Sequence, residues 1–322
     1  MTDNKAEMAI GSFEAPNAVF VVGPTASGKS EFAYRLAKRR NGVVISADSM
    51  QIYRGLDIGT AKESAERRAE VPHEMIDIVD CDAEFSVAEY AARASECAYK
   101  AVREGKLPVF TGGTGLYIEA LLYPMRFGTA CKNPALRNEL EAEAKAYGAE
   151  ALYERLKSLD GATAARLHAN DVKRVIRALE IVLATGRPMA DAADEKKEGD
   201  FIMVAFTCAD RAELYARINA RVDEMIAAGL PDEVRRTAGD FSCQSMQAIG
   251  YKEFAAVADE LRRGELSAKS LDAVAEQIKQ HTRNYAKRQL TWFRRYKFAR
   301  WFEAGDFDGA AEYAESRLDE KR

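Results

Sequence analysis

Short runs of consecutive apolar residues recur along the chain, each bounded by turn-forming residues. They occupy positions 18–22, 43–47, 107–110 and 201–207. Runs of this length are typical of strands that are buried on both faces of a parallel sheet. Stretches with apolar residues at helical spacing lie between and after them, at 31–40, 86–103 and 211–228. This alternation of short strands and helices predicts an α/β fold with a parallel sheet.

The pattern changes in the middle of the chain, where no strand signal is found. Positions 133–160 are rich in Ala, Glu, Leu, Arg and Lys, and apolar residues between 172 and 183 recur every three or four positions. Both features favour helices, and Gly186-Arg187-Pro188 ends the second one. We therefore predict an all-helical domain at 126–199, inserted into a core formed by 17–125 and 200–304. Residues 1–16 and 305–322 are predicted to be a disordered N-terminal tail and a C-terminal tail.

The first apolar run leads into a phosphate-binding motif, Gly23-Pro24-Thr25-Ala26-Ser27-Gly28-Lys29-Ser30. It fits the P-loop pattern G-x-x-x-x-G-K-[ST] and lies between a predicted strand and a predicted helix. The glycines allow turns that direct backbone N–H groups at an anion, and the helix N-terminus adds partial positive charge. Lys29 supplies a mobile positive charge and Ser30 a hydroxyl for Mg²⁺. The alternative is a glycine turn without a ligand, and the pattern does not distinguish a nucleotide from a diphosphate.

Two further polar loops follow predicted strands. Asp48-Ser49-Met50-Gln51 come at the end of the run 43–47, and Thr114 lies in the glycine-rich loop 111–117. Because ligands bind at the carboxyl ends of the strands in open α/β sheets, we expect both loops to face the P-loop. The alternatives are an aspartate that caps the next turn and a simple glycine turn. The polar, glycine-containing stretch 52–62 favours a binding loop.

Basic residues cluster on two of the predicted helices. Lys173, Arg174 and Arg177 gather within about one turn, either as a solvated face or as a contact with a phosphate backbone. Positions 277–302 contain eight Lys or Arg, no acidic residue and several aromatic residues. This mixture is the expected surface for single-stranded or loop RNA, with Lys279, Arg283 and Lys287 in one row on the helix. The alternative is a helix whose aromatic residues pack on the core while its cations extend along the surface.

Composition limits the classes of protein that remain. The 322 residues carry a net charge of −4, so nucleic-acid binding must come from local basic surfaces. Five scattered cysteines without C-x-x-C, and three histidines without H-E-x-x-H, argue against disulfides and a zinc site. We expect no membrane span, because no stretch of about 18 apolar residues occurs. No signal peptide is visible either, and we expect a cytoplasmic location.

Five segments carry a more specific signal, at 23–30, 48–62, 112–117, 174–180 and 247–253. The segment Asp-Ser-Met-Gln-Ile-Tyr-Arg-Gly-Leu-Asp-Ile-Gly-Thr-Ala-Lys at 48–62 is the most distinctive. In this order, and from about residue 17 to residue 302, they resemble the tRNA dimethylallyltransferase family of bacteria. Asn133 is a departure, because the family often has aspartate before this proline.

The resemblance implies a reaction. It is the transfer of a dimethylallyl group from dimethylallyl diphosphate to N6 of the adenine at tRNA position 37, next to the anticodon, which gives N6-isopentenyladenosine and diphosphate. It implies a P-loop NTPase-like core, Mg²⁺ as cofactor, and the tRNA anticodon stem-loop as partner. We expect a monomer. Nucleotide binding, including ATP, stays possible for the P-loop.

The resemblance also implies roles for single residues. The catalytic residues would be Asp48 as general base with Lys29, Thr114 and Arg221. The diphosphate would be held by the P-loop with Arg221 and Arg217. The implied tRNA contacts comprise the loop beginning at Asp48, the glycine-rich loop and the helical insertion: Asp48, Ser49, Met50, Gln51, Thr114, Arg137, Lys173, Arg174, Val175, Ile176 and Arg177. The row Lys279, Arg283 and Lys287 adds the RNA contact expected from the residues alone.

Two other classes remain open. A small-molecule or nucleotide kinase, or an isopentenyltransferase acting on free adenine nucleotides, would also use the P-loop, but neither needs a basic helical insertion. An RNA-binding P-loop module without chemistry would not need Asp48 at the start of a complete 48–62 loop. The sequence therefore favours a tRNA-modifying enzyme.

Overall fold

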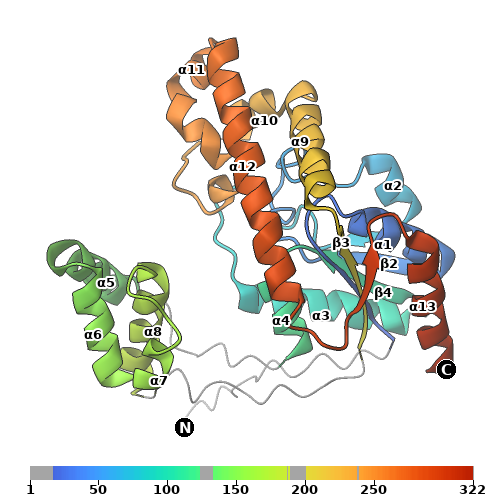
Figure 1. Cartoon of the computed structure of the whole chain (residues 1–322), viewed down its shortest axis with the longest axis horizontal. Coiled ribbons are helices and arrows are strands. Elements are labelled where there is room, and N and C mark those ends of the chain that lie inside the picture. Colours follow the sequence, from blue (N-terminus) through green and yellow to red (C-terminus); the bar gives the residue numbers. More distant parts are fainter. Residues whose placement is uncertain (1–16, 124–132, 187, 189–200, 238, 322) are drawn as a thin grey trace, which may run out of the picture. The chain divides into compact units, whose positions relative to one another are not determined.

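The structure is a computed structural model that describes residues 17–123, 133–186, 188, 201–237 and 239–321. It divides into two compact units (Figure 1). One is the α/β unit, from 17 to 121 and from 201 to 321, and the other is the helical unit, whose described residues lie between 122 and 188. The predicted tail at 1–16 lies outside the described residues.

A six-stranded sheet forms the centre of the α/β unit, in the order β3-β2-β4-β1-β5-β6, and every neighbouring pair of strands is parallel. The strands are β1 (Val19–Val22), β2 (Gly42–Ser46), β3 (His73–Glu74), β4 (Leu107–Gly112), β5 (Ile202–Thr207) and β6 (Arg300–Glu303). The prediction of an α/β fold with a parallel sheet is confirmed. Sequence analysis missed the edge strands β3 and β6, because one is two residues long and neither is a buried apolar run.

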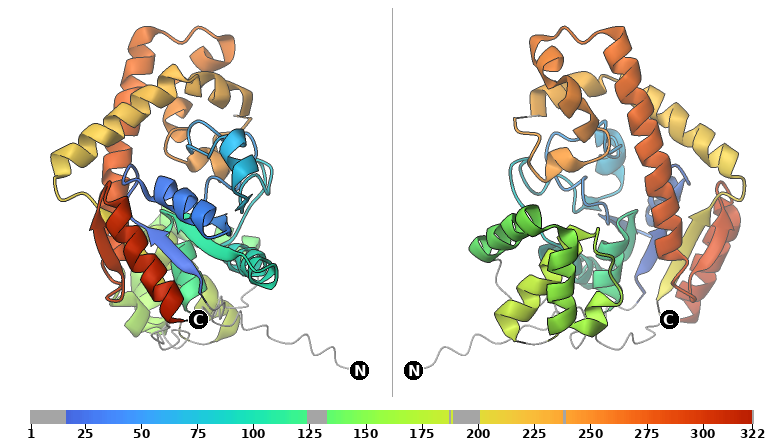
Figure 2. Two further views of the ribbon diagram at one scale, coloured as in Figure 1. Left: turned by 90° about the vertical axis from the view of Figure 1, so that its right-hand side faces the viewer. Right: turned by 60° about the vertical axis from the view of Figure 1, so that its left-hand side comes forward.

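Helices surround this sheet. They are α1 (Lys29–Arg39), α2 (Ala65–Glu70), α3 (Val87–Arg103), α4 (Gly115–Leu122), α9 (Arg211–Ala227), α10 (Leu230–Thr237), α11 (Ala258–Arg263), α12 (Ala268–Phe293) and α13 (Phe307–Glu320), with 3-10 helices at Ser245–Gln247 and Lys252–Val257. Figure 2 shows the long α12 passing beside α9 toward the sheet, and the two helices contact each other. α12 therefore reaches the loops that follow the central strands.

The C-terminal segment is part of the core, so the prediction of a tail at 305–322 is wrong. Helix α13 packs with α1 on one face of the sheet, through Ala310, Ala311, Ala314 and Leu318. Three of these four residues are alanines, which give only a weak hydrophobic pattern in the sequence. The interior of this layer also contains an aromatic contact, with the rings of Phe32 and Phe206 5.2 Å apart.

The described residues of the helical unit form α5 (Pro134–Tyr147), α6 (Ala149–Leu159), α7 (Gly161–Ala164) and α8 (Val172–Thr185). Asn133 caps α5, because its side chain accepts a hydrogen bond from the Leu136 N–H at 3.1 Å. Helix α8 ends at Gly186, in the left-handed conformation that favours glycine. Leucines of α5 and α6 pack against α8 to form a separate small core.

Candidate active site

The P-loop follows β1 and leads into α1 through backbone conformations that only glycine adopts easily. Gly23 and Gly28 have φ values of 141° and 86°. A Cβ on Gly23 would lie 2.6 Å from the carbonyl oxygen of Phe206 on β5. Lys29 begins α1 and donates a hydrogen bond to the carbonyl oxygen of Pro24 at 3.2 Å. The loop therefore has the turn and the helix N-terminus that anion binding requires.

Two cations lie beside the P-loop. The pKa of Lys29 is lowered to about 8, chiefly by burial and then by the neighbouring Arg221, while Asp48 acts in the opposite direction. Burial also lowers the pKa of Arg221, again opposed by Asp48. The charged forms of both side chains are thus less favourable than in water, and a bound anion would offset this effect. This arrangement favours the binding of an anion.

Asp48 follows β2 and opens the loop that sequence analysis singled out. Its Oδ1 accepts a hydrogen bond from the Met50 N–H at 2.9 Å, so the aspartate does cap a turn, as the alternative interpretation proposed. It also lines the same cavities as Arg221, so the two interpretations are compatible. Ser49 N–H donates to Thr114 Oγ1 at 3.0 Å, which fixes this loop to the glycine-rich loop after β4.

Gln51 stabilises the same loop from inside. Its Oε1 accepts a hydrogen bond from the Ser46 hydroxyl at 2.8 Å, and its Nε2 donates to the Thr60 carbonyl at 3.2 Å. The Gln51 amide therefore joins the two ends of the 48–62 loop. Its observed contacts are within the protein, whereas the resemblance implied a contact with tRNA.

The glycine-rich loop packs closely against Ala47, the residue after β2, and against α12. A Cβ on Gly112 would lie 2.1 Å from the Ala47 carbonyl oxygen, and one on Gly113 would lie 1.9 Å from Gln289 Nε2. Tyr285 and Gln289 of α12 both donate to the Gly113 carbonyl, at 3.1 and 3.0 Å. The glycines therefore allow an approach that larger residues would prevent, and sequence analysis did not assign Gln289 to the site.

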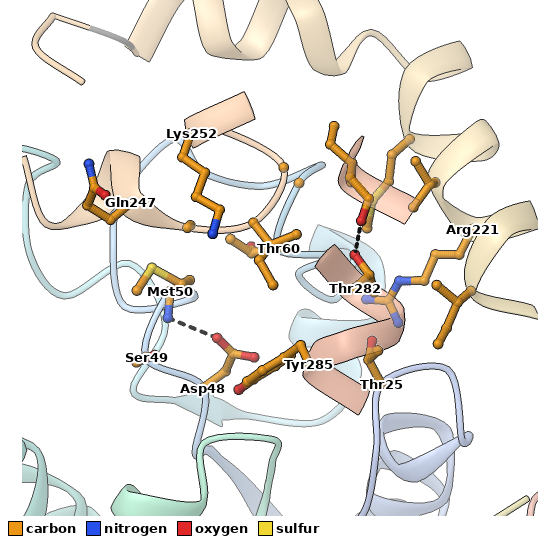
Figure 3. Close-up of a pocket in the computed structure, with 18 of the residues that line it drawn as sticks. Thr25, Asp48, Ser49, Met50, Thr60, Arg221, Gln247, Lys252, Thr282 and Tyr285 are labelled. Carbon is orange, nitrogen blue, oxygen red and sulfur yellow. Dashed lines mark hydrogen bonds between the residues drawn. The ribbon is translucent and has the colours of Figure 1, made fainter. Parts of the chain in front are cut away.

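Two adjoining cavities meet at these loops. Both are lined by Thr25, Asp48, Thr60, Arg221 and Tyr285. Figure 3 shows Asp48, Arg221 and Lys252 directed into the larger one from three separate elements. The smaller cavity reaches Lys29, Ser30 and Thr111, whereas the larger one is lined by the apolar residues Ile218, Val222, Met225, Ile249 and Ile278. An anion site and an apolar space are thus continuous.

A buried carboxylate fixes the segment 57–59, which contributes Gly59 to the lining of the larger cavity. Glu233 of α10 accepts hydrogen bonds from the N–H groups of residues 57, 58 and 59, at 2.9, 2.7 and 3.0 Å. The Tyr251 hydroxyl donates a fourth hydrogen bond to it at 2.6 Å. A Cβ on Gly59 would lie 2.6 Å from the Tyr251 ring. The segment 247–253 that sequence analysis singled out contains Tyr251, but Glu233 was missed, because a single glutamate in a helix carries no signal of burial.

Arg217 and the row on α12 do not lie where they were predicted. Arg217 is exposed, pairs with Glu213 at 2.6 Å and lines neither cavity, unlike Arg221. In the α12 row, Lys279 pairs with Asp223 at 2.8 Å, and Arg283 donates to Asn219 Oδ1 at 2.7 Å.

Lys287 completes the row and lies 5.8 Å from the Tyr215 ring of α9. Lys279 and Arg283 thus pack against α9, whose Asp223 and Asn219 engage them, so these two residues do not form the open RNA-binding ridge that was predicted. Lys287 alone among the three is exposed.

Within the helical unit, the predicted contact residues fall into three groups. Val175 and Ile176 are buried in the unit's core, so their side chains cannot contact tRNA and that prediction is wrong. Arg137 makes two hydrogen bonds to the buried Glu180, at 2.8 and 2.7 Å, and Arg177 approaches the same carboxylate at 3.3 Å. Lys173 and Arg174 are exposed.

Among the residues that the structure describes, no group of three or more His, Cys, Asp or Glu side chains could hold a metal ion. Within the same ranges, no helix combines the length and hydropathy that crossing a membrane requires. Four cysteines there, Cys81, Cys97, Cys208 and Cys243, are free thiols.

Comparisons with known proteins give relatives over most of the chain. A family model described as IPP transferase matches residues 51–296, and one described as isopentenyl transferase matches residues 16–77. The tRNA dimethylallyltransferases of Thermoanaerobacter sp. (strain X514) and Bacillus cytotoxicus are each 44% identical to the chain. These alignments cover 91% and 93% of this chain and 94% and 95% of those proteins.

Solved structures with a similar fold belong to the same class of enzyme. The tRNA isopentenylpyrophosphate transferase of Bacillus halodurans is 40% identical, with a TM-score of 0.68, covering 95% of this chain and 97% of that one. A eukaryotic dimethylallyltransferase whose structure was determined in action on tRNA is 26% identical, with a TM-score of 0.75, over 93% of this chain and 77% of that one.

The fold, the P-loop and these matches define a prenyltransferase with a P-loop NTPase-like core. The chain belongs to the tRNA dimethylallyltransferase family. It is therefore an enzyme of tRNA modification, and the resemblance inferred from the sequence is confirmed.

Proposed function

We propose that the enzyme transfers the dimethylallyl group of dimethylallyl diphosphate to N6 of adenine 37 in the tRNA anticodon loop. The observation that carries this proposal is the cavity that Thr25, Asp48 and Arg221 line together. It places an anion-binding loop and a carboxylate on either side of one space, and an apolar region adjoins them. These are the three environments that an allylic diphosphate and an amine acceptor require.

The proposed reaction forms one bond and breaks one. The adenine N6 attacks the first carbon of the allyl group, the bond from that carbon to the diphosphate oxygen breaks, and diphosphate leaves with the electron pair. The amine is a poor nucleophile because its lone pair is delocalised into the ring, so Asp48 accepts the proton that N6 loses. The P-loop N–H groups with Lys29 and Arg221 stabilise the charge that develops on the leaving group.

Mg²⁺ is the proposed cofactor, and the oxygen donors of the smaller cavity fit it. Ser30 is exposed there beside Asp48 and Thr111. Thr111 Oγ1 is buried without a hydrogen-bond partner among the described residues. Hydroxyls and one carboxylate are suitable for an ion that keeps several waters and binds substrate phosphates. When bound, Mg²⁺ supplies positive charge to the diphosphate.

The acceptor base must leave the stack of the anticodon loop to reach Asp48. We propose that it enters beside Tyr285 and Met50, which line the cavity next to Asp48. Lys173 and Arg174, which are exposed on the helical unit, are the proposed contacts with the phosphates of the anticodon stem. We expect a monomer, because one chain supplies every group named, and a cytoplasmic location, because tRNA is the proposed substrate.

The test is to incubate the protein with Mg²⁺, labelled dimethylallyl diphosphate and unmodified tRNA, and to locate the label by nuclease digestion and mass. We expect the label on the one adenine beside the anticodon. Label on free adenine nucleotides alone, or ATP-dependent phosphorylation of a small acceptor without label on RNA, would contradict the proposal.

A further inference from the structure

The Gln289 side chain on α12 bridges two loops that are 88 positions apart in the sequence, at residues 25 and 113. Its Oε1 accepts a hydrogen bond from the Thr25 N–H of the P-loop at 2.9 Å. Its Nε2 donates to the Gly113 carbonyl of the glycine-rich loop at 3.0 Å. The residue is 4% exposed. One buried amide thus satisfies a donor on one loop and an acceptor on the other.

The bridge continues to the proposed general base. Beyond Gly113, Thr114 Oγ1 accepts from the Ser49 N–H at 3.0 Å, and Thr114 N–H donates to the Ala47 carbonyl at 3.2 Å. Residues 47 and 49 flank Asp48 directly. A chain of hydrogen bonds therefore runs from the phosphate loop through Gln289 and the glycine-rich loop to the backbone on both sides of Asp48.

At neutral pH an amide can make both hydrogen bonds of this residue, whereas an ionised carboxylate or an apolar side chain cannot. A carboxamide presents one acceptor and one donor side by side, whereas an ionised carboxylate has only acceptors. A glutamate would keep the bond to the Thr25 N–H but would direct a negative oxygen at the Gly113 carbonyl. A leucine would leave the Thr25 N–H without this partner, whereas the Gly113 carbonyl would keep the hydrogen bond from Tyr285. Gln289→Glu thus breaks only the half of the bridge at Gly113, whereas Gln289→Leu removes both halves.

We propose that Gln289 is a positioning residue that sets the separation between the phosphate loop and Asp48. This inference rests on the proposed function, in which the loop holds the leaving group and Asp48 accepts the proton. Its effect belongs to the chemical step, because a small displacement of reacting groups lowers the rate more than it lowers affinity. Gln289 also lines the smaller cavity, so the affinity for inorganic diphosphate must be measured to separate positioning from direct contact with the leaving group.

The experiment compares wild type, Gln289→Leu and Gln289→Glu, with Gln280→Glu as a control on an exposed position of α12. The single-turnover transfer rate is measured with saturating tRNA and dimethylallyl diphosphate. Dissociation constants are measured separately for tRNA and for inorganic diphosphate with Mg²⁺. We expect both Gln289 variants to lose about 10- to 100-fold in rate. The dissociation constants and the rate of Gln280→Glu should stay near their wild-type values.

The pH dependence separates positioning from a general loss of structure. Burial raises the pKa of a carboxyl group, so the glutamate introduced by Gln289→Glu becomes protonated as the pH falls and regains a donor for the Gly113 carbonyl. The rate of Gln289→Glu relative to wild type at the same pH should therefore recover toward about pH 6. Gln289→Leu should show no such recovery.

Three results would overturn the inference: a wild-type rate in Gln289→Leu, a diphosphate affinity that falls in proportion to the rate, or a Gln289→Glu deficit that does not vary with pH. If the leucine variant does not fold, the glutamate variant and its pH dependence decide alone. Failure of the proposed function has a different signature, because wild type itself would then transfer no label to tRNA.

Discussion

At the scale of single residues, the charge state of Lys29 connects the fold with anion binding. Its side chain lies at the start of α1, beside a second cation, Arg221, and a single carboxylate, Asp48. The lowered pKa, about 8, follows from burial and from Arg221. A lysine is charged below its pKa, so the site without a ligand loses positive charge as the pH rises through this value.

The affinity for inorganic diphosphate with Mg²⁺ should therefore fall as the pH rises from about 7 to about 9.5, with a midpoint near 8 in the free enzyme. Calorimetric titration with inorganic diphosphate at several pH values measures this affinity, in the wild type and in Lys29→Arg. Arginine stays charged over this range, so the part of the slope that Lys29 causes should be absent in the variant, whereas the titration of diphosphate itself is common to both proteins. Equal slopes in the two proteins would assign the pH dependence to another group.

The site residues that the sequence alone could identify are those that belong to a recognisable local pattern. The P-loop, Asp48 and Thr114 follow strands or belong to glycine-rich patterns, and the rule that ligands bind at the carboxyl ends of parallel strands brings them together. Glu233 and Gln289 carry no such pattern. Each acts through burial and through partners distant in the sequence, which only the packing of α10 and α12 determines.

At the scale of elements, the buried strands were easier to predict than the surroundings of helix faces, such as the basic face of α12 and the alanine-rich face of α13. β1, β2, β4 and β5 are buried on both sides and read as continuous apolar runs. The basic row on α12 was misinterpreted because periodicity shows which residues share a face but not which helix covers that face. α9 supplies Asp223 and Asn219 to that row.

The C-terminal helix α13 tests how much the core depends on an element that resembles a tail in sequence. Leu318 is 4% exposed and packs with α1 and the sheet. We expect Leu318→Ala to lower the free energy of unfolding by about 2–5 kcal/mol, as for other buried leucines. Urea unfolding measures it, with the exposed Glu312→Ala as the matched control. A change of no more than about 0.5 kcal/mol in Leu318→Ala would show that α13 is not part of the core.

At the scale of the whole molecule, the helical unit and the α/β unit have separate cores and separate proposed tasks. The α/β unit holds the reacting groups, and the helical unit presents the exposed cations Lys173 and Arg174. Arg137 and Arg177 are bound to the buried Glu180, so they are less available to a ligand. The division predicts that tRNA affinity and diphosphate affinity can be changed independently.

A double variant, Lys173→Ala with Arg174→Ala, should weaken tRNA binding and reduce the slope of log affinity against log salt concentration by about 1–2. Its affinity for inorganic diphosphate should not change. Lys145→Ala with Lys157→Ala removes two exposed cations from other helices of the same unit and serves as the control. An unchanged tRNA dissociation constant at several salt concentrations would reject this surface as the tRNA contact.

The central claim is that one cavity holds the leaving diphosphate at the P-loop while Asp48 takes the proton from the acceptor amine. Asp48→Asn tests it most directly, because the amide keeps the size of the side chain but cannot serve as a base. The single-turnover transfer rate should fall by about 10²- to 10⁴-fold, with the tRNA and diphosphate dissociation constants unchanged. Transfer by Asp48→Asn at the wild-type rate would contradict the account.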